Sequence, residues 1–185
     1  MSRYVNITSA STTALAGKAN YSTNTALNRR GSNSAIINKI CIVNYGTVDV
    51  TSSVYLNAVL VTRNVNQPNA NTSKIIFDED VIVSEADQIK VGDVCIDSDD
   101  TIHGTVVSIN PSQKSVTISA SVNITDNEVL YFRAPEEKLY IAKTVVPVGA
   151  NLALYDSFSF NVNRYTLTLK PSVASGTPNL TIIIN

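Results

Sequence analysis

The feature that most constrains the fold is an alternation of apolar and polar residues in the C-terminal third of the chain. Tyr165, Leu167 and Leu169 lie on one face of an extended segment, while threonines occupy the other face. Upstream, the stretch 139–160 reads LYIAKTVVPVGANLALYDSFSF, which is an apolar strand, a Pro and Gly break, and a second alternating strand. Both patterns predict antiparallel strands that bury one face against a core.

The composition agrees with an all-β protein and excludes several function classes. Only 16% of the 185 residues are charged, against about a quarter in typical proteins, and Ser, Thr and Asn are abundant. The net charge is −1, so there is no basic surface for nucleic acid or for an anionic membrane. No apolar run approaches the roughly 20 residues that span a bilayer. We therefore expect a soluble protein that binds neither nucleic acid nor membrane directly.

The first half of the chain predicts further strands. The run 35–44, AIINKICIVN, is β-branched and nearly apolar on both faces, which is typical of a central strand. From Val48 to Leu60 apolar residues alternate with polar ones, which predicts one long strand, or two joined by a bend, ending near Arg63. The composition of 64–73 indicates a loop.

The character of the sequence changes over 74–134, where short strands recur at intervals of about ten residues with turns between them. Without this segment, VYLNAVLVTR would continue into LYIAKTVVPVG as a hairpin, and loop tips tolerate insertions. We therefore predict a small β-barrel or β subdomain inserted at 74–134. The segments 35–73 and 135–185 are predicted to form an antiparallel β-sandwich, either Ig-like or jelly-roll-like.

Residues 1–34 are rich in Ser, Thr, Asn and Ala and show no sustained periodicity. They predict an extended N-terminal arm that could lie on a neighbouring subunit as an added strand; the alternative is a flexible or locally packed terminus. The apolar run LTIIIN at 180–185 must be buried or paired, because an exposed apolar edge promotes aggregation. The expected interface residues lie at these two ends: Arg3, Tyr4, Val5, Ile7, Leu180, Ile182 and Ile184.

Acidic residues in the predicted insertion are the candidates for a metal site. Asp97, Asp99 and Asp100 lie within a short span, and hard cations take about six to eight oxygen ligands. The spacing of an EF-hand is absent, so solvated acidic turns are the alternative. The chain has a single histidine, His103, and we therefore do not expect a zinc site of ordinary ligand number.

No arrangement of residues indicates catalysis. No strand–turn–helix nucleophile motif accompanies His103, and we expect it to be a turn residue. Cys41 and Cys95 stand alone in apolar surroundings, so we expect buried free thiols. We predict no enzymatic activity and no cofactor.

The wording KTVVPVGANLALYDSFSFNVNRYTLTLK, followed by LTIII, resembles a recurrent class of virion structural proteins in tailed phages, especially phages of marine cyanobacteria. The resemblance covers about half of the chain. The matching residues are Lys143, Val146, Pro147, Gly149, Leu152, Leu154, Asp156, Tyr165 and Leu167.

This resemblance implies a non-enzymatic virion protein, made in the cytoplasm of the bacterial host, that fastens or decorates the capsid, neck or tail. Its expected partners are other virion proteins and further copies of itself. The alternative is a module of a phage tail or fibre that binds a host-surface glycan or a cation. A binding module should be active as a soluble monomer, whereas an assembly protein should bind its own particle.

Overall fold

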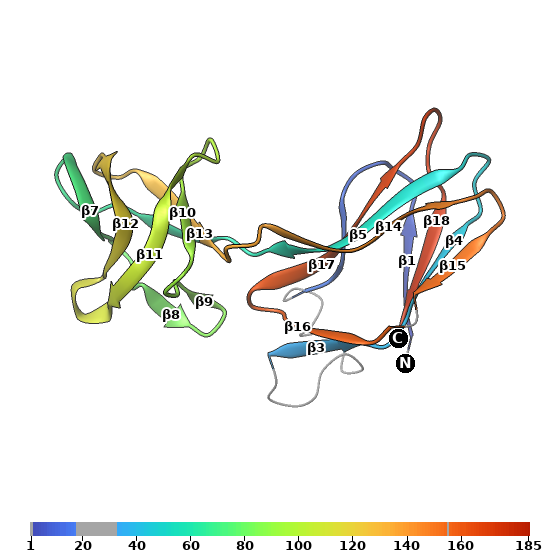
Figure 1. The fold of residues 1–185 in the computed structure, drawn as a ribbon, viewed down its shortest axis with the longest axis horizontal. Coiled ribbons are helices and arrows are strands. Elements are labelled where there is room, and N and C mark those ends of the chain that lie inside the picture. Colours follow the sequence, from blue (N-terminus) through green and yellow to red (C-terminus); the bar gives the residue numbers. More distant parts are fainter. Residues whose placement is uncertain (1, 18–32, 155) are drawn as a thin grey trace. The chain divides into compact units, whose positions relative to one another are not determined.

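The computed structural model describes residues 2–17, 33–154 and 156–185, and these are built from antiparallel strands with one 3-10 turn at Pro111–Gln113 (Figure 1). The all-β prediction is confirmed. The chain divides into two compact units: unit 1 comprises residues 1–57 and 138–185, and unit 2 is Ala58–Glu137. Within the described residues, no helix is long and apolar enough to cross a membrane.

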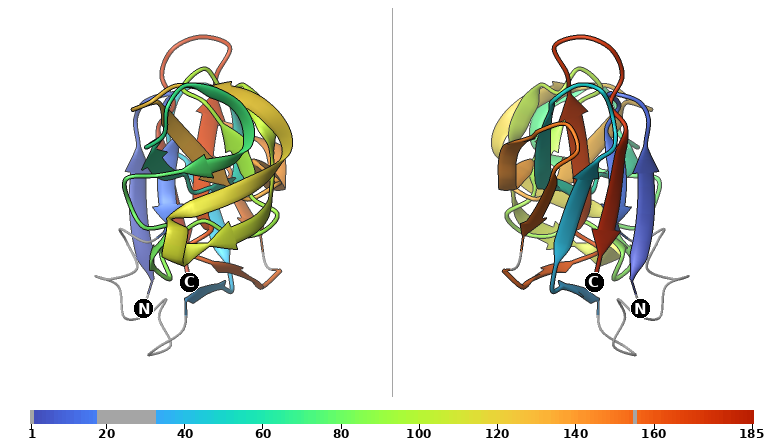
Figure 2. Two further views of the ribbon diagram at one scale, coloured as in Figure 1. Left: turned by 90° about the vertical axis from the view of Figure 1, so that its left-hand side faces the viewer. Right: turned by 90° about the vertical axis from the view of Figure 1, so that its right-hand side faces the viewer.

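Unit 1 contains two four-stranded sheets and a short ribbon. The first sheet has the order β1 (Arg3–Ile7), β18 (Leu180–Ile184), β4 (Ile40–Asn44) and β15 (Asn151–Leu154). Its strands lie side by side in the right-hand view of Figure 2. The second has the order β14 (Lys138–Val146), β5 (Val50–Ala58), β17 (Tyr165–Ser172) and β2 (Thr13–Ala16). The ribbon pairs β3 (Ser34–Ile37) with β16 (Phe158–Asn161).

Both sheets contribute to a single core. Ile42 and Ile182 from the first sheet and Val54 and Leu167 from the second are fully buried in the same cluster. In β18, buried residues alternate with half-buried ones, as expected for a strand with one face on the core. The prediction of an antiparallel sandwich is thus confirmed for unit 1, and its apolar C-terminal strand lies between β1 and β4.

The structure describes residues 2–17 of the predicted N-terminal arm, and these residues do not form an arm. β1 pairs along its whole length with β18, and β2 pairs with β17, so both belong to the sheets of unit 1. The physical reason is burial, because Ile7 and Leu15 supply apolar side chains to the core. Residues 18–32 of the predicted arm lie outside the described residues.

The predicted central strand at 35–44 is two strands. β3 ends at Ile37 and β4 begins at Ile40. Between them the amides of Asn38 and Lys39 both donate to the carbonyl of Asn185, at 2.7 and 3.3 Å, and this shared acceptor interrupts the regular pairing of a strand. One half therefore pairs with β16 and the other with β18 and β15. Because β-branched and apolar residues continue through 35–44, the sequence pattern did not indicate this break.

Unit 2 is a six-stranded sheet that closes on itself. Its order is β6 (Val61–Asn64), β13 (Val129–Arg133), β10 (Val94–Ile96), β11 (Ile102–Asn110), β12 (Ser115–Ile124) and β7 (Ala70–Ile76). A bridge between Val65 and Phe77 joins β7 back to β6, with the Asn66 amide donating to the Ile76 carbonyl at 2.8 Å. A side hairpin consists of β8 (Ile82–Ser84) and β9 (Asp87–Gln88).

The barrel has its own core and begins earlier than predicted. Phe77 and Phe132 meet edge to face, with ring centroids 5.7 Å apart. Residues 58–73, assigned to the sandwich from the sequence, instead contribute Val61 and Val65 to this core, and part of the predicted loop 64–73 is the start of β7. The strand alternation continues through the boundary, so periodicity alone did not mark it.

The barrel is inserted between two paired strands of unit 1. β5 leads into it and β14 leads out, and the two pair from Val50 with Val146 to Asn57 with Lys138, as the predicted hairpin requires. At the tip, the Ala58 amide donates to the Glu137 carbonyl at 2.9 Å.

Candidate functional site

The acidic turn of unit 2 is built around the carboxylate of Asp97. Its Oδ1 accepts hydrogen bonds from the amides of Asp99 and Thr101, at 2.8 and 3.0 Å. Its Oδ2 lies 3.4 Å from Nε2 of His103, without the alignment of a hydrogen bond. The Thr101 amide, followed by the Asp99 amide and His103, lowers the pKa of the Asp97 carboxyl. The oxygens of Asp97 therefore stabilise the turn.

The structure does not bring the three candidate metal ligands together. Asp99 and Asp100 are exposed, and Asp100 has a φ of 62°, which turns the chain back toward β11. Across residues 2–17, 33–154 and 156–185, no group of three or more His, Cys, Asp or Glu is arranged to hold a metal ion. The geometry is that of an acidic turn.

The predicted interface residues fall into two groups. Ile7, Leu180, Ile182 and Ile184 are core residues of unit 1, at most 2% exposed, so their side chains cannot contact a partner. This corrects the sequence-based assignment: Leu180, Ile182 and Ile184 belong to the central strand β18, and Ile7 points from β1 into the core.

The other interface candidates lie on β1, an edge strand of the first sheet. Arg3 donates to the carbonyl of Leu15, and Val5 packs against the core. Tyr4 is 67% exposed and is the member of the set whose side chain faces solvent.

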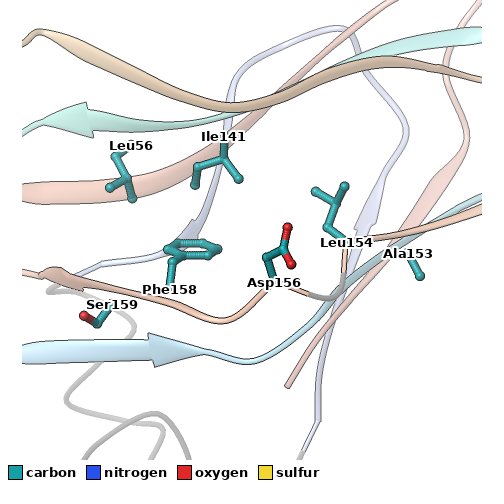
Figure 3. Close-up of a pocket in the computed structure, with 7 residues that line it drawn as sticks. All are labelled: Leu56, Ile141, Ala153, Leu154, Asp156, Phe158 and Ser159. Atoms are coloured by element: carbon teal, nitrogen blue, oxygen red, sulfur yellow. The ribbon is translucent and has the colours of Figure 1, made fainter.

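A pocket that the sequence did not predict lies in unit 1, where the edges of its two sheets approach each other. It has a volume of about 560 Å³. Figure 3 shows its lining, contributed by β5, β14, β15, β16 and the connection between β15 and β16: Leu56, Ile141, Ala153, Leu154, Asp156, Phe158 and Ser159. Five of these side chains are apolar and two, Asp156 and Ser159, are polar, which is a composition typical of binding pockets in general.

The side chain of Ile141 enters this pocket because of an irregularity in β14. The pairing of β14 with β5 shifts between Tyr140 and Ala142, which leaves Ile141 as the extra residue of a β-bulge. A bulge on an edge strand redirects a side chain and increases the local twist. In Figure 3, Ile141 points toward Phe158 and Asp156 from the opposite wall.

Asp156 is the charged residue of the pocket. Its carboxylate points between Ile141 and Leu154 (Figure 3), and the described residues give it no hydrogen-bond or ion-pair partner. The described lining of the pocket therefore combines an apolar surface with the negative charge of Asp156. The sequence signal was present in ALYDSFSF, where an aspartate interrupts an apolar and aromatic stretch, but it predicted only a strand end.

Strand edges flank the pocket on both sides. β14 and β15 are the outermost strands of their sheets, and each pairs with one neighbour among the described residues. The nine-residue β14 also carries Tyr140 and Val145, which are 64% and 53% exposed. A long edge strand with exposed apolar side chains is a surface on which another strand can pair.

Comparisons with known proteins identify no family. No family model matches the chain, and no curated protein is similar to it in sequence. Among solved structures, the whole chain aligns with 96% of VP17, a capsid protein of bacteriophage P23-77, at 12% identity and a TM-score of 0.19. A TM-score of this size does not establish a common fold.

Proposed function

We propose that this protein is a non-enzymatic structural component of a phage virion, which binds other virion proteins through the strand edges of unit 1. The observation that carries the proposal is the edge strand β14. It is nine residues long, pairs with one neighbouring strand among residues 2–17, 33–154 and 156–185, and exposes Tyr140 and Val145.

Such an edge is a liability in a free monomer. Soluble proteins protect edge strands by keeping them short, by charged residues, prolines or bulges, or by covering them with a loop or helix, because unpaired amides and carbonyls pair with other chains. β14 has two of these devices, Lys143 near its middle and the bulge at Ile141, but it is nine residues long and no described strand pairs with its free edge. An edge of this kind is expected where a partner covers it in the assembled state.

The sequence resemblance supports the setting. Its matching residues include Lys143 on β14, Leu152 and Leu154 on β15, and Asp156 in the pocket. The residues that carry the resemblance therefore lie in the same part of unit 1 as the strand edges of β14 and β15. We propose that the chain is present in several copies and fastens or decorates the capsid, neck or tail.

The proposal is tested on phage particles from the source of the sequence. Particles banded on a density gradient are digested for mass spectrometry and labelled with gold-conjugated antibody raised against the recombinant chain. We expect peptides of the chain in the particle band and gold at one location on the particles. Recovery of the chain only among soluble proteins at the top of the gradient would show that it is not a virion protein.

A further inference from the structure

We propose that the β14 edge and its pocket form one docking site for an extended segment of another protein, in which a Lys or Arg is flanked by apolar residues. The segment adds a strand to β14, and its basic side chain extends into the pocket to reach Asp156. This inference rests on the proposed function for the nature of the partner, a second virion protein, but the binding chemistry is argued from the site itself.

The first step is main-chain pairing. An added strand beside β14 pairs with the amides and carbonyls that β5 does not use, and it extends a sheet that already has the order β14-β5-β17-β2. The bulge at Ile141 interrupts this ladder at one point and turns a side chain toward the pocket. The bulge therefore fixes where along β14 the incoming side chain enters.

The second step is side-chain recognition. Lys and Arg have long aliphatic stems that pack on apolar surface while the charged group reaches an anion. Here Ile141, Leu154 and Phe158 provide the apolar surface, and the carboxylate of Asp156 lies between them (Figure 3). Asp156 is exposed, so a cation can reach its carboxylate from solvent while the stem of the basic side chain packs on the apolar wall. An acidic or purely apolar side chain would leave Asp156 unpaired.

A second copy of β14 suits this site less well than a different segment. Antiparallel pairing of two β14 strands keeps the faces of the two sheets aligned. Ala142 and Val146 pair with the buried Val54 and Val50, so they lie on the face of β14 that is directed toward the core. Lys143 follows Ala142 in the strand and therefore lies on the opposite face. Its side chain would therefore not reach the pocket of the other copy.

The test uses the full-length protein and fluorescent peptides as long as β14, nine residues. The probe peptide alternates Thr and Val and has a central Lys; matched peptides carry Gln or Glu at the centre. Binding is measured by fluorescence anisotropy at low and high salt. We expect the Lys peptide to bind about two- to fivefold more tightly than the Gln peptide, since Asp156 is exposed, and the preference to fall as salt rises.

Variants of the protein test whether the preference for the Lys peptide over the Gln peptide comes from the pocket. Asp156→Asn keeps the shape of the side chain and should abolish the preference for Lys over Gln. Ala153→Phe should weaken all peptides by filling the pocket. Asp99→Asn, the same charge change in the exposed turn of unit 2, should leave binding unchanged. Unfolding midpoints of each variant verify that it is folded.

Peptide chemistry separates strand addition from insertion of a side chain alone. N-methylation of alternate residues removes one of the two sets of amide donors. We expect one set of methyl groups to abolish binding and the other to have little effect, because a strand pairs through alternate residues.

Equal binding of the three peptides, or a Lys preference that survives in Asp156→Asn, would overturn the proposal. Dimerisation of the protein that blocks the peptides would do so too, because it would make a second copy the occupant. A chain found in virions without peptide binding would refute this inference alone. Peptide binding by a chain absent from virions would refute the proposed function alone.

Discussion

The side-chain amide of Asn44 donates a hydrogen bond of 2.9 Å to the carbonyl oxygen of Val146, 102 residues further along the chain. The same amide donates to the carbonyl of Val48 at 2.9 Å, and its oxygen accepts from the Gly46 amide at 2.9 Å. Asn44 is fully buried. One side chain therefore fastens the turn after β4 to the end of β14, beside the strand edge on which the proposed function depends.

Replacing Asn44 tests this fastening. Asn44→Asp keeps the acceptor for Gly46 but removes both donors and places a carboxylate against two carbonyls. We expect a loss of at least about 2 kcal/mol in the free energy of unfolding, measured by urea denaturation. Asn123→Ala, at an exposed position, is the control and should change stability by about 0.5 kcal/mol or less. Equal effects of the two variants would contradict the role of Asn44.

Two buried hydroxyl groups in unit 1 should respond oppositely to removal. Ser52 Oγ is buried without a hydrogen-bond partner among the described residues, whereas Thr168 Oγ1 donates to the Tyr55 carbonyl at 3.0 Å. Ser52→Ala should therefore raise the free energy of unfolding by about 1 kcal/mol, and Thr168→Val should lower it by a similar amount. Chemical denaturation of both variants checks the signs. A destabilising Ser52→Ala would mean that the hydroxyl has a partner.

The two cysteines should differ in reactivity. Burial, and then the charges of Glu128 and Asp97, raise the pKa of Cys95 to about 12, so its thiol stays protonated at neutral pH. Cys41, on β4, is only half-buried. Titration of the native protein with a thiol reagent near pH 8 should label one cysteine quickly, and denaturant should expose the second. If the native Cys41→Ser variant still reacted quickly with the thiol reagent, the burial of Cys95 would be contradicted.

Acid should weaken the turn at Asp97. Hydrogen bonds from the Thr101 amide and then the Asp99 amide, followed by the electrostatic effect of His103, lower the pKa of Asp97 in the folded state. Its contribution to stability is thus present above its unfolded pKa of about 3.9 and is lost as pH falls through the lower folded value. Thermal unfolding between neutral and acid pH should show a smaller pH dependence for Asp97→Asn than for the wild type. Asp99→Asn should follow the wild type.

The sequence predicted the fold class, the hairpin of β5 and β14 and the buried C-terminal strand, because each depends on alternation along one strand. It did not predict which side of the domain boundary Val61 and Val65 belong to, since strands of the sandwich and the barrel have the same period. Nor did it reveal the pocket. Ile141, Leu154 and Phe158 come together only through a bulge and the approach of two sheet edges, and neither has a local sequence signature.

The position of β18 between β1 and β4 also determines the order in which the chain can fold during synthesis. The barrel is made from the continuous segment Ala58–Glu137, so all of its contacts are available before residues 180–184 leave the ribosome. The first sheet of the sandwich, by contrast, lacks the strand between β1 and β4 until Leu180–Ile184 has emerged. The nascent chain therefore carries a folded barrel between two halves of an incomplete sandwich, and its apolar strands need protection until Leu180–Ile184 has emerged.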